Sequence, residues 1–173
     1  MEVDNAKGSA RLLQLSVPGC VMQTGEAFDP LALQGLLYGG RRTPLLLYPD
    51  TPDERSLGMP APAPRDTALL ADPGALRLVV LDGTWRKSRK MLYQNPLLQT
   101  LPRLPLAAMP PSRYLIRKAH APDQLSTLEA SCYALAQLHG DARAFEPLLD
   151  AFSGFVAQFQ RTGGRLAESL RAL

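Results

Sequence analysis

The sequence predicts a single α/β domain in which helices pack on a mostly parallel sheet. Short apolar runs typical of buried strands alternate along the chain with longer segments of helical period. A length of 173 residues suits one domain with a sizeable core, and the 46% of hydrophobic and 20% of charged residues are typical of a soluble globular protein. We therefore expect one domain over residues 1–173.

Stop and start signals predict two helices in the first half of the chain. Asp29 suits the N-cap and Pro30 the first position of a helix over residues 29–37. A second helix is expected over residues 84–93, where Asn95 and the proline after it end the helical pattern.

Two further helices are predicted in the second half. Residues 125–139 begin with Ser126 and Glu129 at the spacing of a capping box, and Gly140 ends the pattern. The last helix carries apolar residues at helical spacing: Leu148, Phe152, Phe155 and Phe159.

The predicted strands are short apolar segments bounded by proline, glycine or polar residues. They are residues 20–24, 45–48, 77–82, 103–107 and 114–116, of which 77–82 is the clearest. Residues 9–17 are apolar but too short to separate helix from strand. Proline-rich residues 49–74 predict a long surface loop with one helical turn at 67–70.

Composition excludes several classes of protein. Cys20 and Cys132 lie far apart and the chain has only two histidines, so we expect neither a disulfide framework nor a metal site. No apolar run approaches the length of a membrane span, and the N-terminus lacks the layout of a signal peptide. We therefore expect a cytoplasmic protein without a membrane contact, and no protein partner is implied.

The charges are unevenly distributed. From Gly83 to Pro122 the chain has no acidic residue and eight basic ones, whereas the remainder carries 11 basic and 16 acidic residues. A basic stretch of this length favours a polyanion such as nucleic acid over the alternative, a solvated face whose counter-charges come from elsewhere in the fold.

The strongest local feature is Asp82, which ends the clearest predicted strand. A carboxylate at the carboxyl end of a buried strand, followed by a glycine and a helix start, lies where α/β sheets bind ligands. Asp82 could equally cap the next helix, with the lone tryptophan, Trp85, filling the core. Spacing alone does not separate these two interpretations.

Several ordered motifs resemble the DTW-domain family, which is named for its Asp-x-Thr-Trp motif. The motifs are Leu81-Asp-Gly-Thr-Trp85, Arg89-Lys-Met91, Ser112-Arg-Tyr114 with Arg117-Lys118, and Leu125-Ser-Thr-Leu-Glu-Ala130. Residues 46–49 and 7–12 extend the resemblance over nearly the whole chain, although Gly8 and Ser9 depart from the family pattern. The cysteine-rich, zinc-ribbon-like segment with which many bacterial members begin is absent, so no zinc is expected.

Members of this family are tRNA-uridine aminocarboxypropyltransferases. The resemblance implies transfer of the 3-amino-3-carboxypropyl group from S-adenosylmethionine to N3 of a uridine in tRNA, with release of methylthioadenosine. It also implies a knotted, SPOUT-like fold in which the cofactor lies in loops after the core strands. The expected cofactor-binding residues are Leu47, Tyr48, Pro49, Leu81, Gly83, Thr84, Trp85, Leu125, Ser126 and Thr127.

The resemblance also suggests roles for single side chains. Asp82 is expected to accept or polarise the N3 proton of uridine, which is otherwise a poor nucleophile. The residues expected to contact RNA are Arg86, Lys87, Arg89, Lys90, Arg113, Arg117 and Lys118. The last two could instead hold the cofactor carboxylate.

For four residues we favour a structural role. Trp85 could stack on the adenine or on the target base, but packing beneath the site is favoured, and for Glu129 helix capping is favoured over catalysis. Core packing is also favoured over stacking for Tyr93 and Tyr114.

The sequence also fits two other functions. A SPOUT-type RNA methyltransferase would use the same cofactor but donate its methyl group, and a non-catalytic RNA-binding or assembly factor would transfer nothing. The sequence does not name the uridine or the tRNA.

Overall fold

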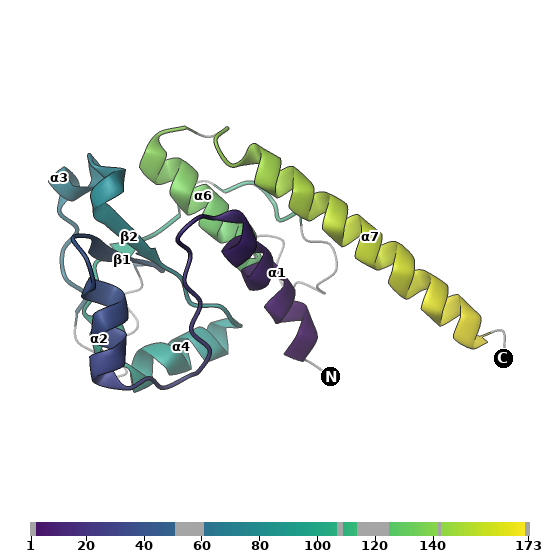
Figure 1. The fold of residues 1–173 in the computed structure, drawn as a ribbon, viewed down its shortest axis with the longest axis horizontal. Coiled ribbons are helices and arrows are strands. Elements are labelled where there is room, and N and C mark those ends of the chain that lie inside the picture. Colours follow the sequence, from purple (N-terminus) through teal and green to yellow (C-terminus); the bar gives the residue numbers. More distant parts are fainter. Residues whose placement is uncertain (1–2, 51–60, 107–108, 114–124, 142, 172–173) are drawn as a thin grey trace.

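The computed structural model describes residues 3–50, 61–106, 109–113, 125–141 and 143–171, and Figure 1 labels most of its elements. In chain order the elements are α1 (Val3–Ser16), α2 (Pro30–Tyr38), β1 (Thr43–Leu47), α3 (Thr67–Leu70), β2 (Leu76–Val79), α4 (Trp85–Gln94), α5 (Pro96–Gln99), β3 (Arg103–Leu104), α6 (Thr127–His139) and α7 (Glu146–Arg171). A short 3-10 turn, Pro73–Ala75, leads into β2.

The strands form one parallel sheet in the order β2-β1-β3. Thr43 of β1 pairs with Leu76 of β2, and Leu47 of β1 pairs with Leu104 of β3. Since the strands run in the same direction, their carboxyl ends lie at one edge of the sheet, which is the edge where α/β folds bind ligands. The prediction of an α/β fold with a parallel sheet is confirmed.

Helices cover both faces of this sheet (Figure 1). Successive strand residues point to opposite faces. Leu46, fully buried, packs into a cluster with residues of α2, α4 and α5. Leu45 instead packs into the cluster that contains Ala134 of α6. The central strand is therefore buried on both sides, which explains its uninterrupted run of leucines.

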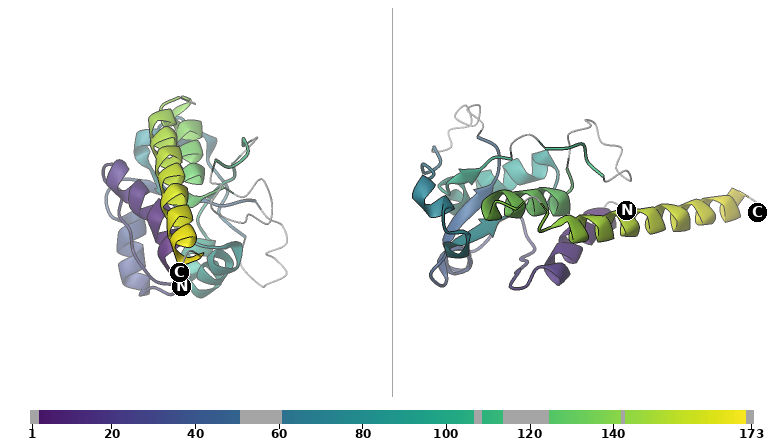
Figure 2. Two further views of the ribbon diagram at one scale, coloured as in Figure 1. Left: turned by 90° about the vertical axis from the view of Figure 1, so that its right-hand side faces the viewer. Right: turned by 90° about the horizontal axis from the view of Figure 1, so that it is seen from above.

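A second layer lies outside α6. Leu128 and Cys132 of α6 pack against Leu149, Phe152 and Val156 of α7. The predicted last helix is confirmed, although Phe155 is 41% exposed because the buried stripe runs through its neighbours. Figure 2 shows that α7 then extends beyond the rest of the molecule. No helix of the described residues is both long and apolar enough to cross a membrane.

The structure confirms the helices that have capping signals. Asp29 accepts a hydrogen bond from the Ala32 backbone N–H at 2.8 Å, as expected for the N-cap of α2. Ser126 and Glu129 form the predicted capping box of α6, and Gly140 ends this helix with a left-handed φ of 68°. The helical turn predicted at 67–70 is present as α3.

The predictions are weaker where no capping residue marks an element. Residues 20–24 form no strand: they pair with no other described strand, and Val21 is 73% exposed. Residues 9–17, whose pattern does not separate helix from strand, are mostly the end of α1. Helix α5 was not predicted, β2 ends at Val79, and β3 has only two residues. The strand predicted at 114–116 and residues 51–60 of the predicted loop lie outside the described residues.

Burial of Cys132 gives the protein a pH-dependent stability. Burial, and to a lesser degree the nearby Glu129 carboxylate, raises the pKa of the Cys132 thiol from 9.0 to about 11. Below pH 9.0 the thiol is protonated in both the folded and the unfolded protein, so the stability is at its full value. As the pH rises from 9.0 toward 11, the unfolded protein loses the thiol proton first, and the folded protein becomes less stable relative to it. We expect the free energy of unfolding, measured with urea, to fall over this range by at most about 1.4 kcal/mol per pH unit. The fall is expected to be smaller in Cys132→Ala, and an equal fall in both proteins would contradict the assignment.

Candidate active site

Three segments of the chain meet at the carboxyl edge of the sheet. Residues 47–49 leave β1, residues 80–84 connect β2 to α4, and residues 125–127 lead into α6. Side-chain contacts join these segments: Tyr48 contacts Trp85, the first residue of α4, and Asp82 accepts a hydrogen bond from Thr127. The structure therefore brings together the three segments that the sequence singled out.

Asp82 is held by the first residue of α6. The Thr127 hydroxyl donates a hydrogen bond of 2.6 Å to Oδ1 of Asp82, across 45 positions of sequence. The Asp82 side chain is exposed, and Oδ2 has no hydrogen-bond donor among the described residues. One carboxylate oxygen is thus fixed, while the other is available to an incoming molecule.

Trp85 lies beside a small stack of side chains. Its ring meets that of Tyr48 edge-on, with centroids 5.7 Å apart and planes at 77°. The Arg103 guanidinium lies over the Tyr48 ring, 4.9 Å from its centroid, and donates a 3.2 Å hydrogen bond to the Pro49 carbonyl. Trp85 itself is 52% exposed. It contacts Tyr48 but is not buried, contrary to the expectation that it packs beneath the site.

Arg103 was counted only as part of the basic stretch, and sequence reasoning missed its role. It is 3% exposed, so its charge lies inside the protein rather than on the surface. An arginine within a predicted buried strand was the signal that could have distinguished it from its basic neighbours.

The turn between Asp82 and α4 is tightly packed. A Cβ at Gly83 would lie 3.1 Å from the Lys87 Cβ, which leaves little room for any other residue. Thr84 is the N-cap of α4, and its hydroxyl oxygen accepts from the Lys87 backbone N–H at 3.4 Å. Ser126 caps α6 in the same way, from a position that is 4% exposed. The hydroxyl oxygens of Thr84 and Ser126 therefore serve as helix caps.

Three leucines are also among the residues expected at the cofactor. Leu47 and Leu81 are half-buried, and their side chains pack against the two clusters that cover the sheet. Leu125 is also half-buried and directly precedes the N-cap of α6.

Glu129 is fully buried and accepts three hydrogen bonds. Its Oε2 accepts from the Ser126 backbone N–H and from the Ser112 hydroxyl, both at 2.8 Å, and its Oε1 accepts from the Arg113 backbone N–H at 2.5 Å. The predicted capping role is confirmed. The carboxylate also fixes the Ser112-Arg113 motif against the start of α6, a contact that sequence reasoning missed.

The basic residues divide according to whether they have an acidic partner. Arg113 pairs with Asp150 at 3.0 Å and with Glu146 at 3.5 Å, both on α7. Lys90 pairs with Glu26 at 2.5 Å, and this hydrogen bond and charge lower the pKa of Glu26. The three exposed basic residues of α4 without an ion pair to any described residue are Arg86, Lys87 and Arg89.

Tyr93 on α4 is 66% exposed, so the expectation that it packs in the core is wrong. Tyr114, Arg117 and Lys118 lie outside the described residues.

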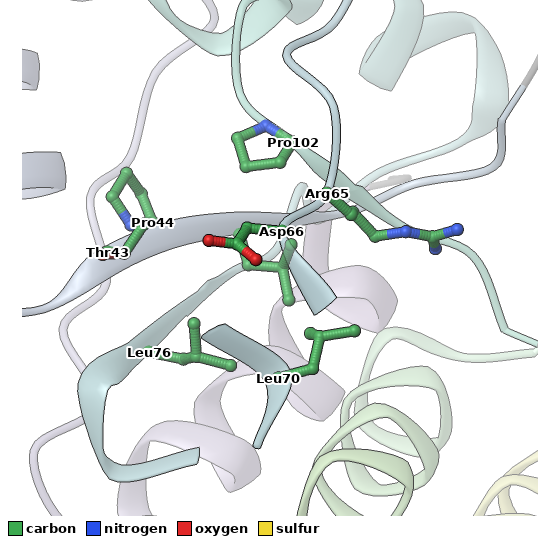
Figure 3. A pocket seen from close by; sticks show the side chains of 8 residues that line it. Thr43, Pro44, Arg65, Asp66, Leu70, Leu76 and Pro102 are labelled. Carbon is green, nitrogen blue, oxygen red and sulfur yellow. The ribbon is translucent and has the colours of Figure 1, made fainter. Parts of the chain in front are cut away.

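A small hollow lies at the opposite end of the sheet (Figure 3). It is lined by Thr43 and Leu76, which begin β1 and β2, by Pro102, which precedes β3, and by Arg65 and Asp66. The amino ends of parallel strands are not where α/β sheets bind their ligands. The hollow is therefore separate from the site around Asp82.

Comparison with known proteins agrees with the sequence motifs. The family model of the DTW domain matches residues 1–160. Over 140 residues the chain is 32% identical to tRNA-uridine aminocarboxypropyltransferase 2 of Drosophila melanogaster. The matched region covers 75% of this chain and 49% of the relative. The chain thus spans about half the length of that relative. No solved structure gives a significant match. Because the family model covers most of the sequence, the chain belongs to the DTW domain family.

Proposed function

We propose that the protein transfers the 3-amino-3-carboxypropyl group of S-adenosylmethionine to N3 of a uridine in tRNA, with release of methylthioadenosine. The observation that carries the proposal is the exposed Asp82 carboxylate, held by Thr127 where three loops meet at the carboxyl edge of the sheet. Family membership and the name of the Drosophila relative support the same reaction.

The charge at this edge fits a sulfonium cofactor. The Asp82 carboxylate provides a negative charge for the cation. When bound, S-adenosylmethionine supplies an electrophilic γ-carbon. The backbone groups of residues 47–49, 81–85 and 125–127 surround the same edge and are proposed to bind the adenosine and methionine ends.

Asp82 is proposed to act on the nucleophile. Uridine N3 carries a proton, so its lone pair becomes reactive only as that proton leaves. Oδ2 of Asp82 is available to accept the proton, while Thr127 keeps the carboxylate in one orientation through Oδ1. In the proposed step Oδ2 of Asp82 takes the N3 proton while N3 bonds to the γ-carbon. The bond between this carbon and sulfur breaks at the same time, so that methylthioadenosine leaves.

The regiochemistry of the reaction depends on positioning. A methyltransferase presents the methyl carbon to its nucleophile, whereas the proposed reaction requires the γ-carbon to face N3 within contact distance. The hydrogen bond from Thr127 suits this task because it orients the Asp82 carboxylate that N3 is proposed to meet. The knotted, SPOUT-like arrangement that the resemblance implies is part of this proposal.

Transfer with doubly labelled cofactor tests the proposal. We expect label in the aminocarboxypropyl chain of S-adenosylmethionine to enter tRNA, and label in its methyl group to remain in the small-molecule fraction. Methyl label in tRNA would indicate a methyltransferase. No label in tRNA would indicate a protein that binds RNA without modifying it.

The basic residues of α4 are proposed to contact RNA phosphates. Replacing both Arg86 and Lys87 by alanine is expected to weaken binding of all tRNAs and to reduce the slope of log K against log salt by about 0.7–0.9 per lost contact. The check is filter binding over a series of salt concentrations. Glu26→Gln, which leaves Lys90 without its acidic partner, should strengthen binding. Unchanged slopes in both variants would contradict the assignment.

A further inference from the structure

Helix α4 presents aromatic rings as well as charges to solvent. Trp85 is 52% and Tyr93 66% exposed, whereas the buried side of the helix consists of Ser88, Met91 and Leu92. Residues four apart lie on the same side of a helix, so Arg89 lies between the two rings. We call Trp85, Arg89 and Tyr93 the aromatic edge of α4. Its rings are separated by about 12 Å along the helix axis.

Trp85 is held in place although it is exposed. Its ring rests edge-on against Tyr48, which is only 5% exposed and lies beneath the Arg103 guanidinium. A ring that is fixed before binding loses little conformational entropy when a flat molecule stacks on it. This arrangement suits a binding surface better than a solvated side chain.

The positive charge around the aromatic edge favours binding of a polyanion. Arg86 and Arg89 are exposed and have no ion pair with any described residue, and no acidic residue occurs from Gly83 to Pro122. Exposed rings between cations are what unpaired nucleotides require, because each base offers a flat face and each phosphate a negative charge. In a duplex the base faces are covered by stacking, so the rings have no surface to contact.

We propose that the aromatic edge of α4 binds unpaired nucleotides of the RNA, with bases stacked on Trp85 and Tyr93 and Arg89 at a phosphate between them. This inference rests on the proposed function and deepens it, since Trp85 adjoins the Asp82 loop. The modified uridine then lies in a single-stranded stretch or loop, next to the bases that α4 holds.

Trp85 reports on this contact directly because it is the only tryptophan of the chain. The full chain is titrated with single-stranded oligouridylate of about ten nucleotides, with a hairpin duplex of equal phosphate number, and with polyglutamate of equal charge. We expect the single strand to quench Trp85 fluorescence and to bind most tightly. Equal affinity and quenching with the duplex or with polyglutamate would overturn the proposal, the latter in favour of an acidic protein partner.

Variants of Tyr93 separate stacking from charge. Tyr93→Leu is expected to weaken binding of the single strand by about 5- to 150-fold without changing the salt slope, whereas Tyr93→Phe retains binding. Tyr93 is exposed, so neither change threatens the fold. Wild-type affinity of Tyr93→Leu would overturn the proposal. Because these titrations need no cofactor, stacking without group transfer would refute only the proposed function, and transfer without stacking would refute only this inference.

Discussion

We expect Asp82→Asn to lower the single-turnover rate of group transfer to tRNA by about 10²- to 10⁴-fold. Asparagine can still accept the Thr127 hydrogen bond through its amide oxygen, so the loop geometry is preserved. Asparagine cannot accept the N3 proton, because its NH2 group takes the place of Oδ2. The affinity for tRNA is expected to remain close to that of the wild-type protein, since Asp82 contributes no cationic contact to phosphate.

One control makes the same substitution at a distant aspartate, and two others change the hydrogen bond that orients Asp82. Asp66→Asn, at the opposite end of the sheet, is expected to retain full activity. Thr127→Val removes the donor that orients Asp82 and is expected to lower the rate less than Asp82→Asn, while Thr127→Ser restores it. An Asp82→Asn protein that transfers the group at the wild-type rate would show that another residue accepts the proton.

The largest effect on stability is expected from Glu129→Gln. Glutamine keeps one acceptor oxygen, but its amide group then faces an N–H donor, either that of Ser126 or that of Arg113. A buried donor that loses its charged acceptor costs about 1–3 kcal/mol, and we expect a loss of this size in the free energy of unfolding. In a chain of this size, each kcal/mol lowers the melting temperature by about 2–4 °C.

Urea and thermal unfolding measure this loss, with Glu146→Gln as the matched control. Glu146 also contacts the Ser112-Arg113 motif, but its ion pair with Arg113 is exposed and lies at 3.5 Å. Exposed pairs contribute about 0–1 kcal/mol. Equal stabilities of the Glu129 and Glu146 variants would show that the buried carboxylate does not hold the motif against α6.

The parts of the fold that local chemistry determines were predictable from the sequence. The caps of α2 and α6 depend on residues within four positions of each other, and both were predicted correctly. The segment at 20–24 has the composition of a strand, but a strand also needs a neighbour with free backbone groups. Sequence pattern alone does not show whether such a neighbour exists.

The site was predictable only in part, because its contacts join distant residues. The three loops were singled out through the family resemblance, and the hydrogen bond from Thr127 to Asp82 emerged only from the structure. Tyr93 was assigned to the core by residue type, yet it lies on the solvent side of α4 because Ser88, Met91 and Leu92 occupy the other side. Residue type alone suggests that Arg103 lies at the surface, yet the structure buries it against a tyrosine ring and a carbonyl that are remote in sequence.

Transfer of the aminocarboxypropyl group to uridine is tested most directly by mass spectrometry of both products, after the protein is incubated with tRNA and S-adenosylmethionine. We predict a uridine that carries the aminocarboxypropyl group at N3, together with an equimolar amount of methylthioadenosine. Over the same incubation time, Asp82→Asn should form far less of both products, in proportion to its lower transfer rate. A methylated nucleoside together with S-adenosylhomocysteine would contradict the proposed group transfer.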